Sequence, residues 1–133
     1  MCDIQYIYSV LHTVLCDERS NMEKNDIISG MIMELRRGTI VLCVLSQLEK
    51  PMYGYSLVSA LSDSGIAVEA NTLYPLLRRL ESQGMLESKW ETEDGPKPRK
   101  YYCITELGKE VLTIMKNQWE QTVESMEVIL RKG

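Results

Sequence analysis

The chain has 133 residues, of which 44% are hydrophobic and 26% charged, and its formal net charge is −4. These values are typical of an ordinary soluble protein with one globular domain and an appendage. The absence of Phe excludes a phenylalanine-rich core, and a small core in a chain with eight Met suggests that oligomerisation supplies part of the buried surface. The acidic charge argues only weakly against a nucleic-acid partner, because binding depends on the local field.

The cysteines and the histidine do not form a metal-binding pattern. Cys2, Cys16, Cys43 and Cys103 show no C-x-x-C spacing, and His12 is the only histidine. We therefore expect no zinc site and no cofactor. Cys43 is predicted to be a small core residue, whereas Cys103 leaves a redox-sensing role open. Unpaired thiols and the lack of a secretory signal predict a cytoplasmic location.

Residues 1–21 carry an apolar helical stripe followed by a polar stretch, Asp17 to Asn21, which predicts a loop. The stripe is too short to span a bilayer, so we expect no membrane partner. This extension is either an extra helix that covers a dimer or docks on the core, or a segment that precedes a natural start at Met22. The second interpretation is preferred.

Two helices are predicted between residues 22 and 50. Asp26 is expected to cap the first at Ile27, and the second covers residues 35–47, where nearly every position is apolar. Arg36 and Arg37 at its start either face phosphate or form a solvated helix end.

A further helix is predicted to open at residues 52–55 after Pro51. Gly54 would permit a close backbone approach at the helix start, where N–H groups can hold a phosphate. Tyr53 and Tyr55 either bond to phosphate or pack in the core, and core packing is expected for at least one of them.

Residues 68–85 form the most informative stretch of the chain. Pro75 falls near the first turn of a predicted helix that Gly84 ends. A helix with one apolar side and one side of amide, hydroxyl, phenol and guanidinium groups suits the major groove of DNA. The apolar side, at spacings of three and four, consists of Leu73, Leu76, Leu77 and Leu80. The polar side consists of Asn71, Thr72, Tyr74, Arg78 and Arg79.

Two strands joined by a turn are predicted directly after this helix. Residues 86–92 and 101–105 carry strand formers, and the turn signal is Glu93-Asp94-Gly95-Pro96. A helix followed by a hairpin with a basic tip predicts a winged helix-turn-helix domain over residues 22–106. The alternative is an ordinary α+β fragment with a solvated charged loop. The basic residues at the tip are Lys97, Arg99 and Lys100.

One long helix is predicted over residues 106–131, and residues 107–133 are assigned to dimerisation. Its apolar residues repeat at three and four, close to a heptad seam. The small winged domain cannot cover this whole stripe, so a second copy is the expected partner. The predicted dimerisation residues are Leu112, Met115, Trp119, Val123, Met126 and Leu130.

Several of these stretches occur together, in matching order and spacing, in a known family. They are Tyr53-Gly54-Tyr55-Ser56-Leu57, the run TLYPLLRRLE at residues 72–81, Arg99-Lys100-Tyr101-Tyr102 and Thr105-Glu106-Leu107-Gly108. Through them the chain resembles the PadR family of transcriptional regulators, from about residue 35 to residue 108.

The resemblance implies a mainly α fold with a small β-hairpin wing (α+β): a winged helix-turn-helix domain plus a long C-terminal dimerisation helix. It also implies a homodimeric repressor of a promoter operator in double-stranded DNA, relieved by a small-molecule effector. The residues expected to bind DNA, from the polar side of the helix, the basic tip and the possible phosphate contact, are Asn71, Thr72, Tyr74, Arg78, Arg79, Lys97, Arg99, Lys100 and Tyr53. Trp119 is either a stacking partner for an aromatic effector or plain dimer packing, and the second is preferred.

The chain departs from the family pattern just before the helix at residues 70–82. Serine is frequent there in the family, whereas this chain has Glu69, a poorer cap whose charge would repel a phosphate. If Asn71 acts as the cap instead, it is not free to read a base.

Two other classes of function are compared with the regulator. A protein-interaction module would keep the winged fold and the dimer seam without binding DNA, and the acidic charge and Glu69 support it. An enzyme is not expected, because paired carboxylates, a nucleophile-base set and a phosphate-binding glycine loop are all missing.

Overall fold

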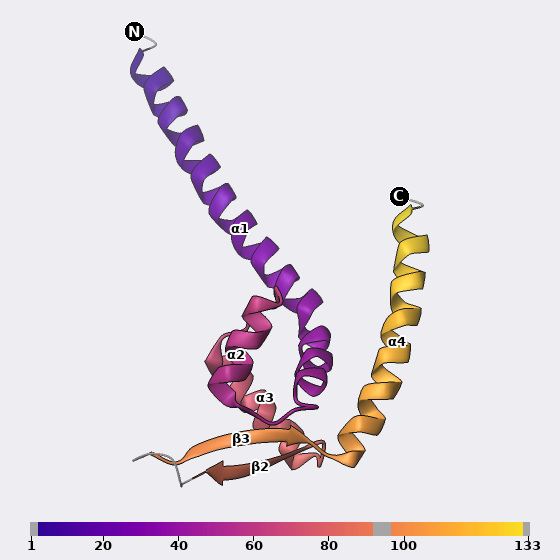
Figure 1. Ribbon diagram of the computed structural model, residues 1–133. Helices are drawn as coiled ribbons and strands as arrows, with labels where there is room; N and C mark the ends of the chain where they lie inside the picture. The colour runs from indigo at the N-terminus through magenta and orange to yellow at the C-terminus, as the bar shows by residue number, and fades with distance from the viewer. Residues whose placement is uncertain (1–2, 92–96, 132–133) are drawn as a thin grey trace. The chain divides into compact units, whose positions relative to one another are not determined.

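The computed structural model describes the backbone of residues 3–91 and 97–131, and side chains from residue 20 onward within these ranges (Figure 1). The chain divides into two compact units, residues 1–38 and 39–133. The elements are α1 (Asp3–Gln47), β1 (Met52–Tyr53), α2 (Gly54–Asp63), α3 (Ala70–Ser82), β2 (Leu86–Glu91), β3 (Arg99–Ile104) and α4 (Glu106–Arg131).

The described part of the first unit consists of residues 3–38 of helix α1, whose last residues belong to the second unit. The predicted loop at residues 17–21 and the predicted helix start at Ile27 are both wrong, because α1 continues through both positions. The polar run at 17–21 contains neither Gly nor Pro, so its residues each lower helix propensity by less than about 1 kcal/mol. A run of polar residues without Gly or Pro therefore does not end the helix here.

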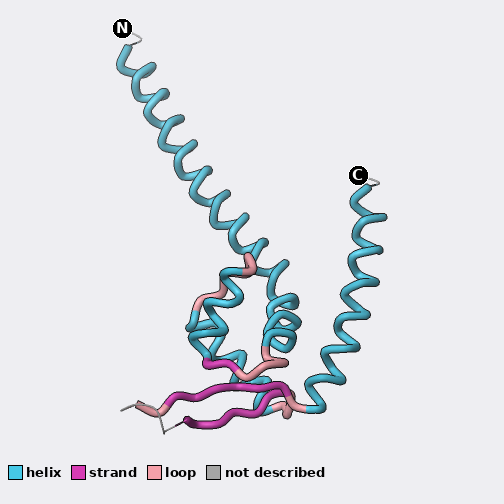
Figure 2. The backbone as a smooth tube through the Cα atoms, viewed as in Figure 1, coloured by secondary structure: helices cyan, strands magenta, loops and turns pink. Residues whose placement is uncertain are grey.

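The second unit contains a three-stranded antiparallel sheet in the order β1-β3-β2 (Figure 2). β2 and β3 form the predicted hairpin, and the turn at residues 93–96 lies outside the described residues. β1 was not predicted: Met52 and Tyr53 pair with Tyr102 and Tyr101, so α2 begins only at Gly54. A strand of two residues is too short for hydrophobic periodicity to reveal it.

An aliphatic core joins the end of α1, α2, α3, the hairpin and the start of α4. The predicted apolar side of α3 faces this core, although Leu76 is only partly buried. Helix α3 ends at Ser82, and Gly84 follows in the left-handed conformation with φ of +82°. The predicted winged helix-turn-helix fold is thus confirmed. Core residues no more than 4% exposed include Leu45, Leu48, Leu57, Leu61, Leu73, Leu77, Leu80, Leu86, Tyr102, Ile104 and Leu112.

Helix α4 begins at the junction between α3 and the hairpin, and its predicted bounds are confirmed. Thr105 Oγ1 accepts a hydrogen bond from the Gly108 N–H at 3.1 Å and donates one to the Gly84 carbonyl at 2.6 Å. Gly108 is buried, and a Cβ atom there would overlap the Met85 carbonyl oxygen and lie 2.5 Å from Ile104 Cγ1. Close packing at this junction therefore requires a glycine.

We predict that Gly108→Ala destabilises the protein, whereas Gly30→Ala stabilises it. Both glycines are helical, but a Cβ atom at Gly108 meets fixed backbone and one at Gly30 meets nothing within 4 Å. Overpacking costs about 1–3 kcal/mol, and replacing a helix-interior glycine by alanine gains about 0.5–1 kcal/mol. Thermal and denaturant unfolding followed by circular dichroism should show opposite shifts, and two shifts of the same sign would contradict the packing at Gly108.

Candidate nucleic-acid interface

Helix α3 presents its predicted polar side to solvent. Ala70 is its first residue, and Glu69 occupies the N-cap position without a side-chain capping bond. The Glu69 carbonyl accepts hydrogen bonds from the N–H groups of Thr72 and Leu73 at 3.0 and 2.9 Å. Asn71 lies inside the helix and is not its cap, so capping does not withdraw its amide from solvent. The exposed polar residues are Asn71, Thr72, Tyr74, Arg78 and Arg79.

Pro75 lies in the second turn of α3 rather than the first. A proline has no N–H group, so the Asn71 carbonyl one turn earlier receives no helical hydrogen bond from it. Both residues are exposed, and water can satisfy that carbonyl.

The close approach at Gly54 is made by a side chain of the same protein. A Cβ atom at Gly54 would lie 2.5 Å from Cε1 and 2.8 Å from the hydroxyl oxygen of Tyr74. The buried glycine at the start of α2 therefore makes room for the Tyr74 ring on α3. The Tyr74 ring thus fills the space on the Cβ side of Gly54, and phosphate binding by the N–H groups at this helix start stays a prediction.

One face of the hairpin carries an aromatic and cationic cluster that reaches the start of α2. The Tyr53 and Tyr55 rings stack with centroids 5.6 Å apart, and the Arg99 guanidinium lies 5.7 and 6.0 Å from these centroids. Arg99 Nη1 donates a hydrogen bond to the Tyr55 hydroxyl at 3.3 Å. Tyr55 is 55% exposed and Tyr53 partly exposed, so neither belongs to the buried core. The predicted core packing of one of these tyrosines is therefore wrong.

Tyr53 also donates a hydrogen bond to the Glu91 carboxylate. This hydrogen bond, together with desolvation, raises the pKa of the Tyr53 phenol above its ordinary value. The Tyr53 phenol therefore loses its proton only at a higher pH than an ordinary tyrosine does.

The other face of the hairpin points toward α3 and holds Lys100. Its Nζ atom lies 3.6 Å from Glu81 Oε2, 5.2 Å from the Tyr102 ring centroid and 5.8 Å from the Trp90 centroid. Ser88 Oγ donates a hydrogen bond to Glu81 Oε1 at 2.7 Å. Sequence reasoning missed the roles of these partners, because they follow from the strand register and not from any local motif.

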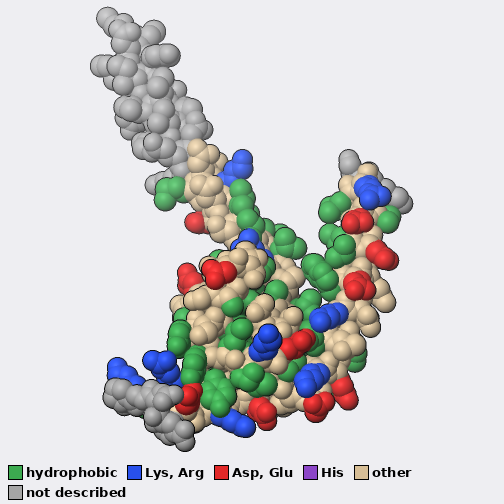
Figure 3. Space-filling model, in the orientation of Figure 1, with side chains coloured by type: hydrophobic (Ala, Val, Ile, Leu, Met, Phe, Trp, Pro, Cys, Tyr) green, Lys and Arg blue, Asp and Glu red, His purple; other side chains and the backbone are tan. Residues whose placement is uncertain are grey.

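An open pocket of about 390 Å³ lies between α3, the start of α2 and the hairpin. Its lining combines three cations with five aromatic rings and includes no carboxylate among the described residues. Lys and Arg side chains also gather beside the grey end of the hairpin in Figure 3. The lining residues are Tyr53, Gly54, Tyr55, Tyr74, Arg78, Trp90, Arg99, Lys100 and Tyr102.

The structure brings some predicted residues together and leaves others apart. Tyr53, Tyr74, Arg78, Arg99 and Lys100 line this pocket, whereas the remaining predicted residues do not. The remainder, all exposed, are Asn71, Thr72, Arg79 and Lys97.

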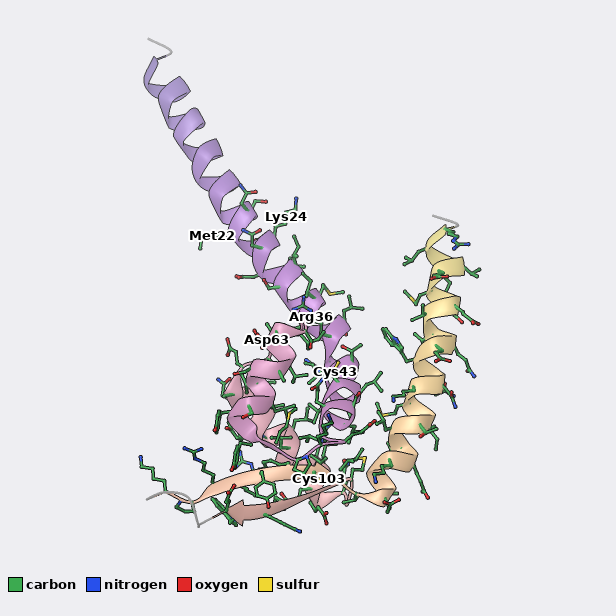
Figure 4. The ribbon with its side chains drawn as sticks, viewed as in Figure 1. Met22, Lys24, Arg36, Cys43, Asp63 and Cys103 are labelled. Carbon is green, nitrogen blue, oxygen red and sulfur yellow. The ribbon has the colours of Figure 1, made fainter. Side chains whose placement is uncertain are left out.

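Other kinds of site were sought among the described residues. They contain no group of three His, Cys, Asp or Glu side chains placed to hold a metal ion. Cys43 and Cys103 are free thiols of intermediate exposure (Figure 4), and burial raises the pKa of Cys43. In the described part of the chain, no helix has the length and apolar character to cross a membrane.

The predicted seam of α4 changes from buried to exposed along the helix. Leu112 is 3% exposed and lies in the core of the second unit, with Met115 packed against that core. Beyond them, Trp119 is 46%, Met126 40% and Leu130 69% exposed. The side available to a partner therefore begins after Met115.

Several known proteins are similar to this chain in sequence and fold. A model of the transcriptional regulator PadR-like family matches residues 41–114. A PadR family transcriptional regulator from Eggerthella lenta is 53% identical, with 84% of this chain and 99% of that chain covered and a TM-score of 0.77. The transcriptional regulator Rv3488 of Mycobacterium tuberculosis is 36% identical over 81 residues, which cover 60% of this chain and 75% of that protein.

The Bacillus subtilis PadR, solved in complex with operator DNA, shares the fold. Its TM-score is 0.54 at 21% identity, with 58% of this chain and 45% of that chain covered. The match of the family model to more than half of the chain confirms the predicted family, and with it the expectation of a regulator rather than an enzyme. This chain belongs to the PadR-like family of transcriptional regulators.

Proposed function

We propose that the protein is a homodimeric, sequence-specific DNA-binding regulator that represses transcription by occupying a promoter operator. The observation that carries this proposal is the exposed polar side of α3 beside a pocket lined by Arg78, Arg99 and Lys100. A protein of the same fold, Bacillus subtilis PadR, binds operator DNA.

Helix α3 is the proposed recognition helix. Residues near the N-terminus of such a helix contact base edges in the major groove, which assigns that contact to Asn71 and Thr72. Tyr74 and Arg78 lie further along the same exposed side. A guanidinium can bind guanine through two hydrogen bonds or bind a phosphate, so Arg78 and Arg79 suit either role.

The hairpin is the proposed wing. Arg99 is exposed and is held by the stacked pair Tyr53 and Tyr55, which places its charge before DNA arrives. Lys97 is exposed next to the described end of β3. Both residues suit phosphate contacts or entry into the minor groove. The single O–H proton of Tyr53 is donated to Glu91, so Tyr53 would act by holding Arg99 and not by donating to a phosphate.

Helix α4 is the proposed dimer contact. Trp119, Met126 and Leu130 are exposed and recur along one side of this helix. A second copy would bury them in a two-fold interface. Two recognition helices about 34–36 Å apart would then enter successive major grooves.

An effector that binds near this interface is proposed to relieve repression. Trp119 lies midway along α4 and is 46% exposed, which leaves its indole face available to a planar aromatic compound in place of the partner's side chains. Relief requires two states of the dimer that differ in the spacing of the recognition helices. The effector must bind these two states with different affinities.

We predict tight binding to DNA from upstream of the protein's own gene and weak binding to a scrambled duplex. Fluorescence anisotropy titrations at two salt concentrations measure both affinity and salt slope. Arg99→Gln should weaken binding to both duplexes and flatten the slope by about one. Arg78→Ala should reduce the preference for the native duplex by about 1–3 kcal/mol if it reads a base.

The outcomes separate the candidate functions. Equal and weak binding to both duplexes would place the operator elsewhere and contradict the upstream site. No binding at low salt would contradict DNA binding and favour the protein-interaction module, for which α4 would be the surface to study.

A separate prediction concerns the dimer. Met126→Glu should raise the dimer dissociation constant by about a hundredfold or more, because an unpaired buried charge costs about 3–5 kcal/mol. Val128→Glu is the matched control, since Val128 is 55% exposed two residues along α4 and therefore on another side. Sedimentation equilibrium measures both variants. An unchanged dimer in Met126→Glu would remove this residue from the interface.

A further inference from the structure

Glu81 on α3 contacts both strands of the hairpin. Its Oε1 atom accepts a hydrogen bond from Ser88 Oγ on β2 at 2.7 Å, and its Oε2 atom lies 3.6 Å from Lys100 Nζ on β3. One carboxylate therefore connects the proposed recognition helix to each strand of the proposed wing.

The strand register explains why both contacts are possible. Ser88 pairs with Tyr102 and Trp90 pairs with Lys100. Residues opposite each other share a face of a sheet, as do residues two apart on one strand. These four side chains consequently lie on one face. Because Tyr102 is only 4% exposed, this is the face that packs inward toward α3.

Lys100 is already engaged within the protein. Besides Glu81, its ammonium group lies over the Tyr102 and Trp90 rings, and its side chain is only 28% exposed. Arg99 precedes it on β3, so it points to the opposite face, and it is exposed. Both cations line the pocket, but from opposite faces of β3: Lys100 is bound to a carboxylate of α3, whereas Arg99 is held by the Tyr53 and Tyr55 rings.

The outer part of the hairpin depends on such side-chain contacts for its position. β1 pairs only with Tyr101 and Tyr102, so the pairs Trp90–Lys100 and Glu91–Arg99 extend beyond the third strand. A two-stranded ribbon is only marginally stable by itself. An ion pair as exposed as Glu81–Lys100 adds little to global stability, but it can fix where the ribbon lies.

We propose that Glu81 is a positioning residue for DNA binding: together with Ser88 and Lys100, it holds the wing at a fixed position against α3. Lys100 serves this contact and not a DNA phosphate, in contrast to the expectation from sequence. The inference rests on the proposed DNA-binding function, because a fixed wing allows α3 and Arg99 to contact one duplex together.

Whether neutralising Glu81 weakens or strengthens DNA binding distinguishes a positioning role from simple repulsion of the phosphates. A carboxylate near DNA that has no structural role repels the phosphates, so its neutralisation strengthens binding to every sequence. A positioning carboxylate has the opposite effect, because its loss releases the wing. Glu81→Gln tests this directly, since glutamine keeps an acceptor for Ser88 and removes the charge that holds Lys100.

The full-length protein and Glu81→Gln should first be compared without DNA. Hydrogen exchange of the backbone amides in β2 and β3 should become faster at the outer pairs, while the midpoint of thermal unfolding stays nearly unchanged. The matched control is Glu87→Gln, which removes the same charge from an exposed residue of β2 on the opposite face. Exchange in the control should match the wild-type protein.

The same proteins should then be titrated with the native and scrambled duplexes. Glu81→Gln should weaken binding to the native duplex by about three- to tenfold, the range of modest coupling between contacting residues. Glu87→Gln should bind slightly more tightly. Lys100→Gln should reproduce the loss seen in Glu81→Gln without flattening the salt slope, and the double variant should be no weaker than either single variant.

Three results would overturn the inference. The first is that Glu81→Gln binds the native duplex as tightly as the wild-type protein or more tightly. The second is that hydrogen exchange in β2 and β3 is unchanged in Glu81→Gln. The third is that Lys100→Gln flattens the salt slope by about one and that the losses add in the double variant. If the wild-type protein binds neither duplex, the proposed function fails, and a positioning role for Glu81 in DNA binding fails with it. The exchange measurement would then still decide whether Glu81 holds the wing against α3.

Discussion

Burial of the leucine side of α3 is the interaction on which the candidate site depends. Leu73, Leu77 and Leu80 are no more than 1% exposed, and full burial of each such side chain contributes about 1.5–3 kcal/mol before the entropy of ordering is subtracted. Because a helix has 3.6 residues per turn, fixing these leucines inward fixes Thr72, Tyr74 and Arg78 outward. The geometry of the polar surface is therefore a consequence of the core.

Local arrangement, and not net charge, decides the electrostatics of this surface. The chain carries a net charge of −4, yet three cations line the pocket between α3 and the hairpin. Two carboxylates near them, Glu81 and Glu91, are bound to Lys100 and Tyr53 and do not line the pocket. Acidic residues can thus position a basic surface, and total charge is a poor guide to the partner of such a protein.

Hydrophobic periodicity predicted α3 and α4, which each carry an apolar side over several turns. Strand formers and a turn signal predicted the hairpin. Periodicity failed where structure depends on pairing between distant segments: β1 exists only because Met52 and Tyr53 meet β3, and the Lys100 contact requires the register of β2 with β3. It also failed at the polar run in α1, through which the helix continues. Such contacts leave no local pattern in a single sequence.

Helix α4 shows why one apolar stripe need not have one role. Leu112 completes the core of the second unit, and Thr105 and Gly108 fix the start of the helix against the segment that follows α3. The later residues of the same stripe are exposed (Figure 3). A second copy that covers them, as proposed, would be joined to the proposed recognition helix through this packed junction. A change at the far part of α4 would then alter the spacing of two recognition helices without any change inside either winged domain.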